Sequence, residues 1–194
     1  MNETECTLCE RIYKHLQEIR KKYPDYHCKP VWGKGSLNSR ICIIGLAPGL
    51  HGANKTGIPF TADFSGQLIR EIIKELDIDE YFITNVVRCY PENNLPQADE
   101  KNNCQIYNYQ ELLSLQNLKV IIALGEVAYR QIFKLYNIKY STHKFEHGNV
   151  VKLNEKINLI SSYHCSKLNI NTHKINKDML KRIFLRAIKL SYHG

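Results

Sequence analysis

Arg40-Ile-Cys-Ile-Ile-Gly-Leu46 is an almost uninterrupted apolar run that ends in Gly-Leu. A run of this kind is typical of a strand that is buried on both faces of a parallel sheet. Similar runs recur at residues 81–87, 119–125 and 158–163. Segments with helical spacing separate the runs, and this alternation predicts an α/β fold with a parallel sheet.

Three polar loops follow predicted strands, at residues 47–63, 88–97 and 164–176. Ligand sites of open α/β sheets lie beyond the carboxyl ends of the strands, so these loops are expected to meet at one edge. The helices that separate the strands are expected at residues 5–22, 65–76, 99–115, 126–136 and 177–191.

Length and composition favour one globular domain over residues 1–194. The chain is 43% hydrophobic and 24% charged, and its net charge is +8. The surplus of positive charge predicts attraction to a polyanion. The sequence shows neither a signal peptide nor an apolar run of about 18 residues. We therefore expect a cytoplasmic protein, not a membrane protein, in which the cysteines stay reduced.

Four of the seven cysteines are candidate metal ligands. Cys6 and Cys9 form a C-x2-C pair, and Cys89 directly follows a predicted strand, with Cys104 further along. Four thiolates can hold zinc or an iron–sulfur cluster. The alternative is that these cysteines are small buried apolar side chains.

The loop after the first strand reads Gly45-Leu-Ala-Pro-Gly-Leu-His-Gly-Ala-Asn-Lys-Thr-Gly-Ile-Pro-Phe-Thr-Ala-Asp63. It contains neither a Walker motif nor a dinucleotide fingerprint. Its glycines allow the main chain to approach a ligand closely, and Phe60 is a candidate stacking platform. Asp63 precedes a predicted helix, where an aspartate is either a helix cap or a catalytic acid.

This loop resembles the first signature of the family 5 (B-type) uracil-DNA glycosylases. Ser162-Tyr-His-Cys-Ser-Lys-Leu-Asn169 resembles their second signature, and Thr84-Asn-Val-Val-Arg-Cys-Tyr-Pro-Glu-Asn-Asn94 also matches the superfamily. The resemblance implies a three-layer α/β/α sandwich around a four-stranded parallel sheet. It further implies a [4Fe–4S] cluster held by Cys6, Cys9, Cys89 and Cys104.

The implied activity is hydrolysis of the N-glycosidic bond of uracil in DNA, which leaves an abasic site. Family 5 members also accept other bases, such as hypoxanthine, xanthine and ethenocytosine. Because the target base lies inside a duplex, the enzyme must first flip it out. The implied partner is double-stranded DNA with damaged bases, and single-stranded DNA is a further candidate. We expect a monomer.

The family signatures imply roles for individual residues. Asp63 would stabilise positive charge on the sugar, and His164 would donate to an oxygen of the base. Ala47 stands where relatives place an acid or amide, and this shifts the catalytic duty to Asp63. The residues implied around the base are Gly45, Leu46, Ala47, Gly49, Phe60, Asn85 and Asn94. The residues implied at the DNA are Lys55, Arg88, Ser166, Lys167, Leu168 and Asn169, with Leu168 as a wedge.

Three alternatives remain open. Asn85 also suits a narrower, family 4-like enzyme that is specific for uracil. A non-catalytic DNA-binding module with a structural zinc site is a second alternative, and an enzyme of small nucleotides is a third. Residues 167–194 hold seven Lys or Arg against one acid. This excess predicts a DNA-facing side.

Overall fold

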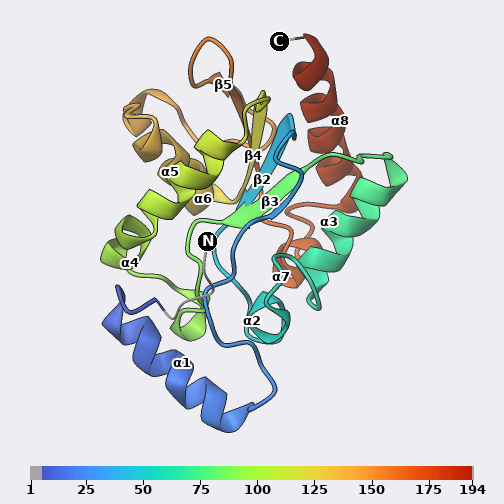
Figure 1. Ribbon diagram of the computed structural model, residues 1–194. Coiled ribbons are helices and arrows are strands. Elements are labelled where there is room, and N and C mark those ends of the chain that lie inside the picture. The colour runs from blue at the N-terminus through green and yellow to red at the C-terminus, as the bar shows by residue number, and fades with distance from the viewer. Residues whose placement is uncertain (1–5, 194) are drawn as a thin grey trace.

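The computed structural model describes residues 6–193. Its strands form one six-stranded sheet in the order β1-β3-β2-β4-β6-β5 (Figure 1). The four inner strands run parallel, as expected: β3 (Phe82–Asn85), β2 (Ile41–Gly45), β4 (Val120–Leu124) and β6 (Asn158–Ser162). The edge strands β1 (Lys34–Gly35) and β5 (Val150–Lys152) are antiparallel and were not expected. With two and three residues, they are too short to show a period in the sequence.

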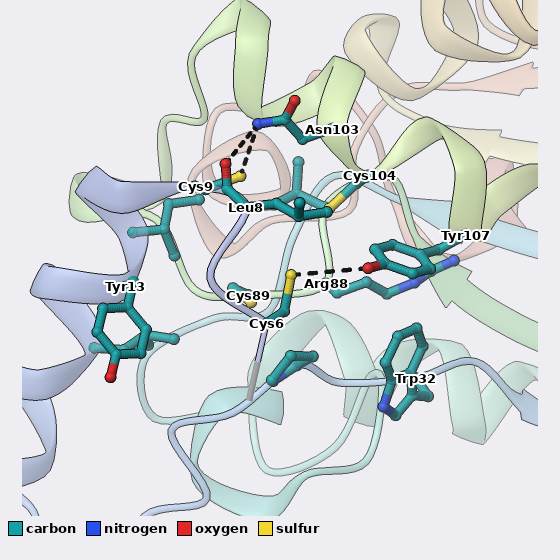
Figure 2. Close-up of a pocket in the computed structure, with 14 residues that line it drawn as sticks. Cys6, Leu8, Cys9, Tyr13, Trp32, Arg88, Cys89, Asn103, Cys104 and Tyr107 are labelled. Atoms are coloured by element: carbon teal, nitrogen blue, oxygen red, sulfur yellow. Dashed lines mark hydrogen bonds between the residues drawn. The ribbon is translucent and has the colours of Figure 1, made fainter. Parts of the chain in front are cut away.

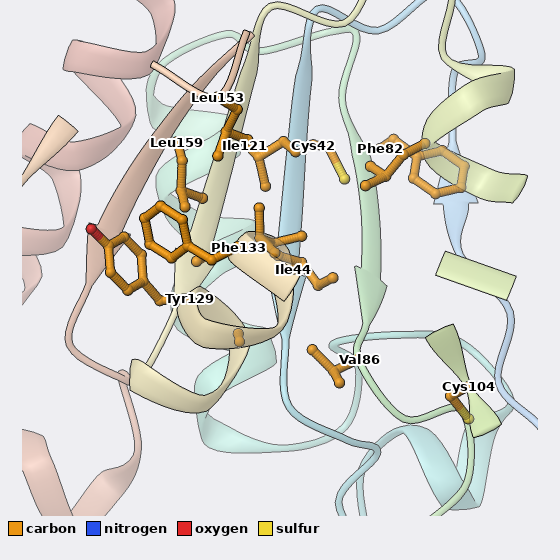
Figure 3. Close-up of a cluster of buried hydrophobic side chains, with 14 of the residues drawn as sticks. Cys42, Ile44, Phe82, Val86, Cys104, Ile121, Tyr129, Phe133, Leu153 and Leu159 are labelled. Atoms are coloured by element: carbon orange, nitrogen blue, oxygen red, sulfur yellow. The ribbon is translucent and has the colours of Figure 1, made fainter. Parts of the chain in front are cut away.

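The helices cover both faces of the sheet, which confirms the three-layer arrangement (Figure 1). Side chains alternate along a strand, so Ile41 and Ile43 of β2 pack with the helices α3 (Phe64–Glu75) and α8 (Lys177–His193). Cys42 and Ile44 point to the opposite core, with Tyr129 and Phe133 (Figure 3). The helices on that side are α1 (Glu10–Lys22), α5 (Gln105–Ser114) and α6 (Glu126–Leu135).

The predicted helix at residues 99–115 is divided in two, and α4 (Ala98–Asn103) meets α5 at Cys104. Two of the expected loops contain short helices, α2 (Ala53–Thr56) and α7 (Lys167–Asn171). Single turns of 3-10 helix lie at η1 (Glu92–Asn94) and η2 (Tyr140–Thr142). In the described part of the chain, no helix combines the length and the apolar character needed to cross a membrane.

The predicted DNA contact of Arg88 is wrong, because its guanidinium group is buried below the carboxyl end of β3. Arg88 is 1% exposed, and its Nη2 lies 2.6 Å from Glu111 Oε2. The Glu111 carboxylate also accepts hydrogen bonds from Thr84 Oγ1 (2.8 Å) and the Gly33 main-chain N–H (2.8 Å). Arg88 Nη2 donates to Asn108 Oδ1 at 3.0 Å. The positive charge therefore joins β3 to α5 inside the molecule.

Replacing Arg88 should destabilise the fold, because the Glu111 carboxylate would stay buried without its cation. We expect Arg88→Met to lower the free energy of unfolding by about 3–5 kcal/mol. Urea unfolding measures this loss. The matched control is Lys152→Met, which removes an exposed pair with Glu155 (3.1 Å) and should cost less than about 1 kcal/mol. Equal losses in the two variants would contradict a structural role for the buried pair.

Candidate active site

A pocket of about 220 Å³ lies at the carboxyl ends of the inner strands, where the three polar loops meet. The loop after β2 contributes the predicted residues Leu46, Ala47, Gly49, Phe60 and Asp63. The other loops contribute Asn85, Asn94, His164, Ser166 and Lys167. Phe64 and Ser65, at the start of α3, also line this pocket but were not predicted. The only feature of the sequence that could have indicated these two residues is their position beside Asp63.

Asp63 is both the cap of α3 and a wall of the pocket. Its Oδ1 accepts a hydrogen bond from the Gly66 main-chain N–H at 2.8 Å. Its Oδ2 lies against two glycines of the loop after β2. A Cβ atom at Gly49 would lie 3.2 Å from Oδ2, and a Cβ atom at Gly52 would overlap it. The sequence left a helix cap and a catalytic acid as alternative roles of Asp63. The two roles do not exclude each other, because the two carboxylate oxygens have separate contacts.

Burial shifts the pKa values of Asp63 and His164 in opposite directions. Desolvation raises the pKa of Asp63 above its usual value, although the Gly66 N–H and His164 act against this. Desolvation also lowers the pKa of His164, and the nearby Asp63 carboxylate partly offsets the effect. A lowered pKa keeps the imidazole neutral to lower pH than usual. A neutral imidazole still has one N–H to donate.

Phe60 is held in a left-handed conformation at the base of the pocket. Its φ is +54°, which is uncommon for a bulky residue and persists only when its surroundings fix it. Arg70 of α3 supplies such a constraint, since its Nε donates to the Phe60 carbonyl at 2.8 Å. Gly45 leaves room for the ring, because a Cβ atom there would lie 2.5 Å from Phe60 Cζ. Gly45 thus acts beneath the pocket and does not line it. No motif or pattern in the sequence indicates this role of Arg70.

Asn85 and Asn94 approach the pocket from the carboxyl end of β3 and from the loop that follows it. Asn85 ends β3, is 3% exposed, and has its Oδ1 next to Gly45. Asn94 lies in η1 with a φ of +57° and is exposed to solvent. The two amides therefore reach the pocket at different depths.

The loop after β6 brings His164 and the predicted wedge to the rim of the pocket. Ser166 caps α7, and Leu168 on that helix is 70% exposed. Asn169 Nδ2 donates to the His164 carbonyl at 2.7 Å, so the Asn169 side chain supports the histidine. Ser65 Oγ donates to the Cys165 carbonyl at 3.1 Å and joins this loop to α3.

Cys6, Cys9, Cys89 and Cys104 line a second, smaller pocket beneath α1 (Figure 2). They come from the N-terminal segment, the loop after β3 and the junction of α4 with α5. Asn103 Nδ2 donates to Cys9 Sγ at 3.5 Å, and Tyr107 Oη lies 3.9 Å from Cys6 Sγ. Within residues 6–193, no three His, Cys, Asp or Glu side chains are arranged to hold a single metal ion.

The basic C-terminal segment is less free to attract DNA than its sequence indicates. Lys177 Nζ pairs with Glu71 Oε1 at 2.5 Å and also with Glu75. Lys181 Nζ pairs with Glu75 Oε2 at 3.0 Å. Two of its seven cations are therefore matched by acids of α3. Lys167 on α7, another of the seven, is exposed, as is Lys55 on α2.

The fold and the site together define a class of protein. The family model described as "Uracil DNA glycosylase superfamily" matches residues 32–188, and the chain belongs to this superfamily. It is 31% identical to a type-5 uracil-DNA glycosylase of Thermus thermophilus, over 97% of this chain and 94% of the relative. It is 31% identical to a type-5 enzyme of Pyrobaculum aerophilum, over 94% and 87% of the two chains. A type-4 uracil-DNA glycosylase of Sulfurisphaera tokodaii is 32% identical over 92% of this chain and 84% of its own length.

The electrostatic link between Asp63 and His164 can be tested by titration. The Asp63 carboxylate raises the pKa of His164, so Asp63→Asn should lower that pKa further below its ordinary value. Proton NMR of the imidazole signals against pH measures the change. Asp178→Asn, which removes an exposed acid of α8, is the control and should have no effect. A pKa of His164 that stays constant or rises in Asp63→Asn would contradict the link.

Proposed function

We propose that this chain is a monofunctional DNA glycosylase that hydrolyses the N-glycosidic bond of uracil in DNA and leaves an abasic site. The observation that carries the proposal is the shared pocket of Asp63 and His164 beside Phe60 and Asn85. Membership of the superfamily and the names of the type-4 and type-5 relatives support it.

In the proposed reaction, the C1′–N bond breaks and its electron pair leaves with the base. Positive charge then builds on the sugar, as in other glycoside hydrolyses. The Asp63 carboxylate stabilises that charge and orients the water whose oxygen bonds to C1′. This water loses one proton, which balances the negative charge of the departed base. His164 donates its N–H to an oxygen of the departing base, in the manner of an oxyanion hole. Main-chain N–H groups of residues 46–50 are further candidate donors.

The flipped base would stack on Phe60, a contact that can contribute about 1–3 kcal/mol. The exposed Leu168 would fill the space that the base leaves in the duplex. Lys55, Lys167 and Ser166 would contact the sugar–phosphate backbone, and the role of Asn169 would be indirect, through His164. We propose double-stranded DNA as the main substrate, a monomeric enzyme, and a place in the cytoplasm with the DNA.

The four-cysteine pocket fits the chemistry of a [4Fe–4S] cluster. Thiolates are the soft ligands that bind iron–sulfur clusters and zinc. Each cysteine of such a cluster binds a different iron, and the four cysteines here line one pocket. The cluster would supply a cross-link between the N-terminal segment and the end of β3. Hydrolysis transfers no electrons, so the proposed role is structural.

The proposal also concerns which bases, besides uracil, the enzyme releases from DNA. Asn85 lies in the pocket with an amide that can pair with the edge of uracil, and this favours a uracil-specific enzyme. The resemblance to the family 5 signatures favours the wider range, which includes hypoxanthine, xanthine and ethenocytosine, whereas the names of the type-5 relatives mention uracil alone.

Base release from a panel of duplexes tests the function. Each duplex carries one uracil, hypoxanthine, xanthine or ethenocytosine, and strands are scored for alkali-labile sites. We expect release of uracil, with strand breakage only after alkali treatment. Release of uracil alone would select the uracil-specific alternative. DNA binding without release of any base would contradict the proposed function and favour a binding module.

Iron analysis tests the cluster. The purified protein should be brown and contain about four iron atoms and matching sulfide per chain. Cys104→Ala should lose the visible absorption and most of the iron, whereas Cys42→Ala, in the core strand β2, should keep both. A colourless protein that contains zinc would contradict the cluster.

A further inference from the structure

Beside the pocket lies a partly exposed cluster of three rings and one lysine, of which the proposed function uses Lys55 alone. Tyr23 and Tyr26 stack with ring centroids 4.6 Å apart, just after α1. His51, in the loop after β2, stands edge-on to both rings, with centroids 5.6 and 6.0 Å away. Lys55 Nζ of α2 lies 5.6 Å from the centroid of the Tyr26 ring. We call these four residues the aromatic–basic surface.

A hydrogen bond orients His51 within this surface. Tyr26 Oη lies 2.9 Å from His51 Nδ1. When the phenol donates to Nδ1, the ring proton is on Nε2, because the bond made by one ring nitrogen sets the state of the other. His51 is exposed, and its Nε2 has no hydrogen-bond partner within residues 6–193. In that tautomer, the ring presents an N–H donor to solvent.

The ammonium group of Lys55, and that of Lys22 beside the surface, are not neutralised by carboxylates of the described residues. Within the described residues, neither Lys55 nor Lys22 forms an ion pair with a carboxylate, and Lys22 lies over the Tyr23 ring at 5.4 Å. Lys177 and Lys181, by contrast, are paired with acids. An exposed N–H beside unpaired ammonium groups is suited to phosphate.

The surface is continuous with the proposed reaction centre. His51 directly precedes Gly52, whose Cα adjoins Asp63 Oδ2. The main-chain N–H groups of His27 and Cys28 donate to the carbonyls of Lys55 and Asn54, both at 3.1 Å, and join the turn after α1 to α2. In Figure 1, the C-terminal end of α1 lies at the same end of the molecule as α2 and α7. Tyr23 and Tyr26 precede the residues that the family model matches.

We propose that the aromatic–basic surface binds a phosphate group of the DNA strand that flanks the flipped nucleotide. His51 Nε2–H and Lys55 Nζ are the donors, and Tyr26 fixes the orientation of His51. This inference rests on the proposed function, because it takes the pocket to hold a flipped base.

The experiment compares His51→Ala, Lys55→Ala and Tyr26→Phe with the unchanged chain. One readout is binding of a long undamaged duplex by fluorescence anisotropy at several salt concentrations. The other is single-turnover release of uracil from a long duplex and from two duplexes shortened on either side of the uracil. Lys14→Ala is the matched control, because this lysine is also exposed but pairs with Glu10 on α1.

Loss of the His51 or Lys55 side chain should weaken binding by up to about fivefold, the size of an exposed ion pair. Lys55→Ala should reduce the slope of log affinity against log salt by about 0.9. Tyr26→Phe should have a smaller effect, and none in a His51→Ala background. Shortening the duplex on one side should remove the difference between the variants and the unchanged chain.

Equal affinities for the long duplex in all four proteins would overturn the proposal. An equal loss on long and shortened duplexes would also overturn it, since that result would place the effect inside the base pocket. If neither the unchanged chain nor any of the variants releases uracil, the proposed function fails. The anisotropy data still decide whether the surface binds phosphate. Competition by free phosphate at millimolar concentration would indicate a small-anion site instead of a DNA-strand site.

Discussion

The contacts of the Asp63 carboxylate are the constraint around which the pocket is built. One oxygen accepts the Gly66 N–H at the start of α3, so the helix fixes the carboxylate in place. The other lies against Gly49 and Gly52, where larger residues would crowd or overlap it. Burial raises the pKa of this group, and His164, whose pKa burial lowers, shares its pocket. The Asp63 side chain therefore caps α3 and is also the proposed catalytic acid.

The surrounding elements hold this arrangement from below and from the sides. Arg70 fixes the strained main chain at Phe60, and Asn169 holds the main chain of His164. The buried Arg88–Glu111 pair secures the end of β3, next to Asn85 and Cys89. The four cysteines lie just beyond that pair, between the N-terminal segment and the rest of the fold. A cross-link there would therefore support the same strand end that carries Asn85.

Much of the fold could be read from the sequence, because the buried strands are continuous apolar runs and the polar loops follow their carboxyl ends. The same topology and the family signatures also predicted that Asp63, His164 and Phe60 lie in one site. The sequence could not show that Arg88 is buried, because burial depends on Glu111, 23 residues away. The pairing of Lys177 with Glu71 was hidden for the same reason. Local patterns do not encode contacts between distant segments.

The most direct measurement of the central claim is single-turnover uracil release by Asp63→Ser, together with its thermal unfolding. Serine can still cap α3 but carries no charge, so the melting temperature should stay close to that of the unchanged chain. The rate of base release should fall by about 10²-fold or more, the size expected when a charge-stabilising group is lost from a reaction centre. Base release at the original rate would show that Asp63 is only a helix cap and would contradict the account.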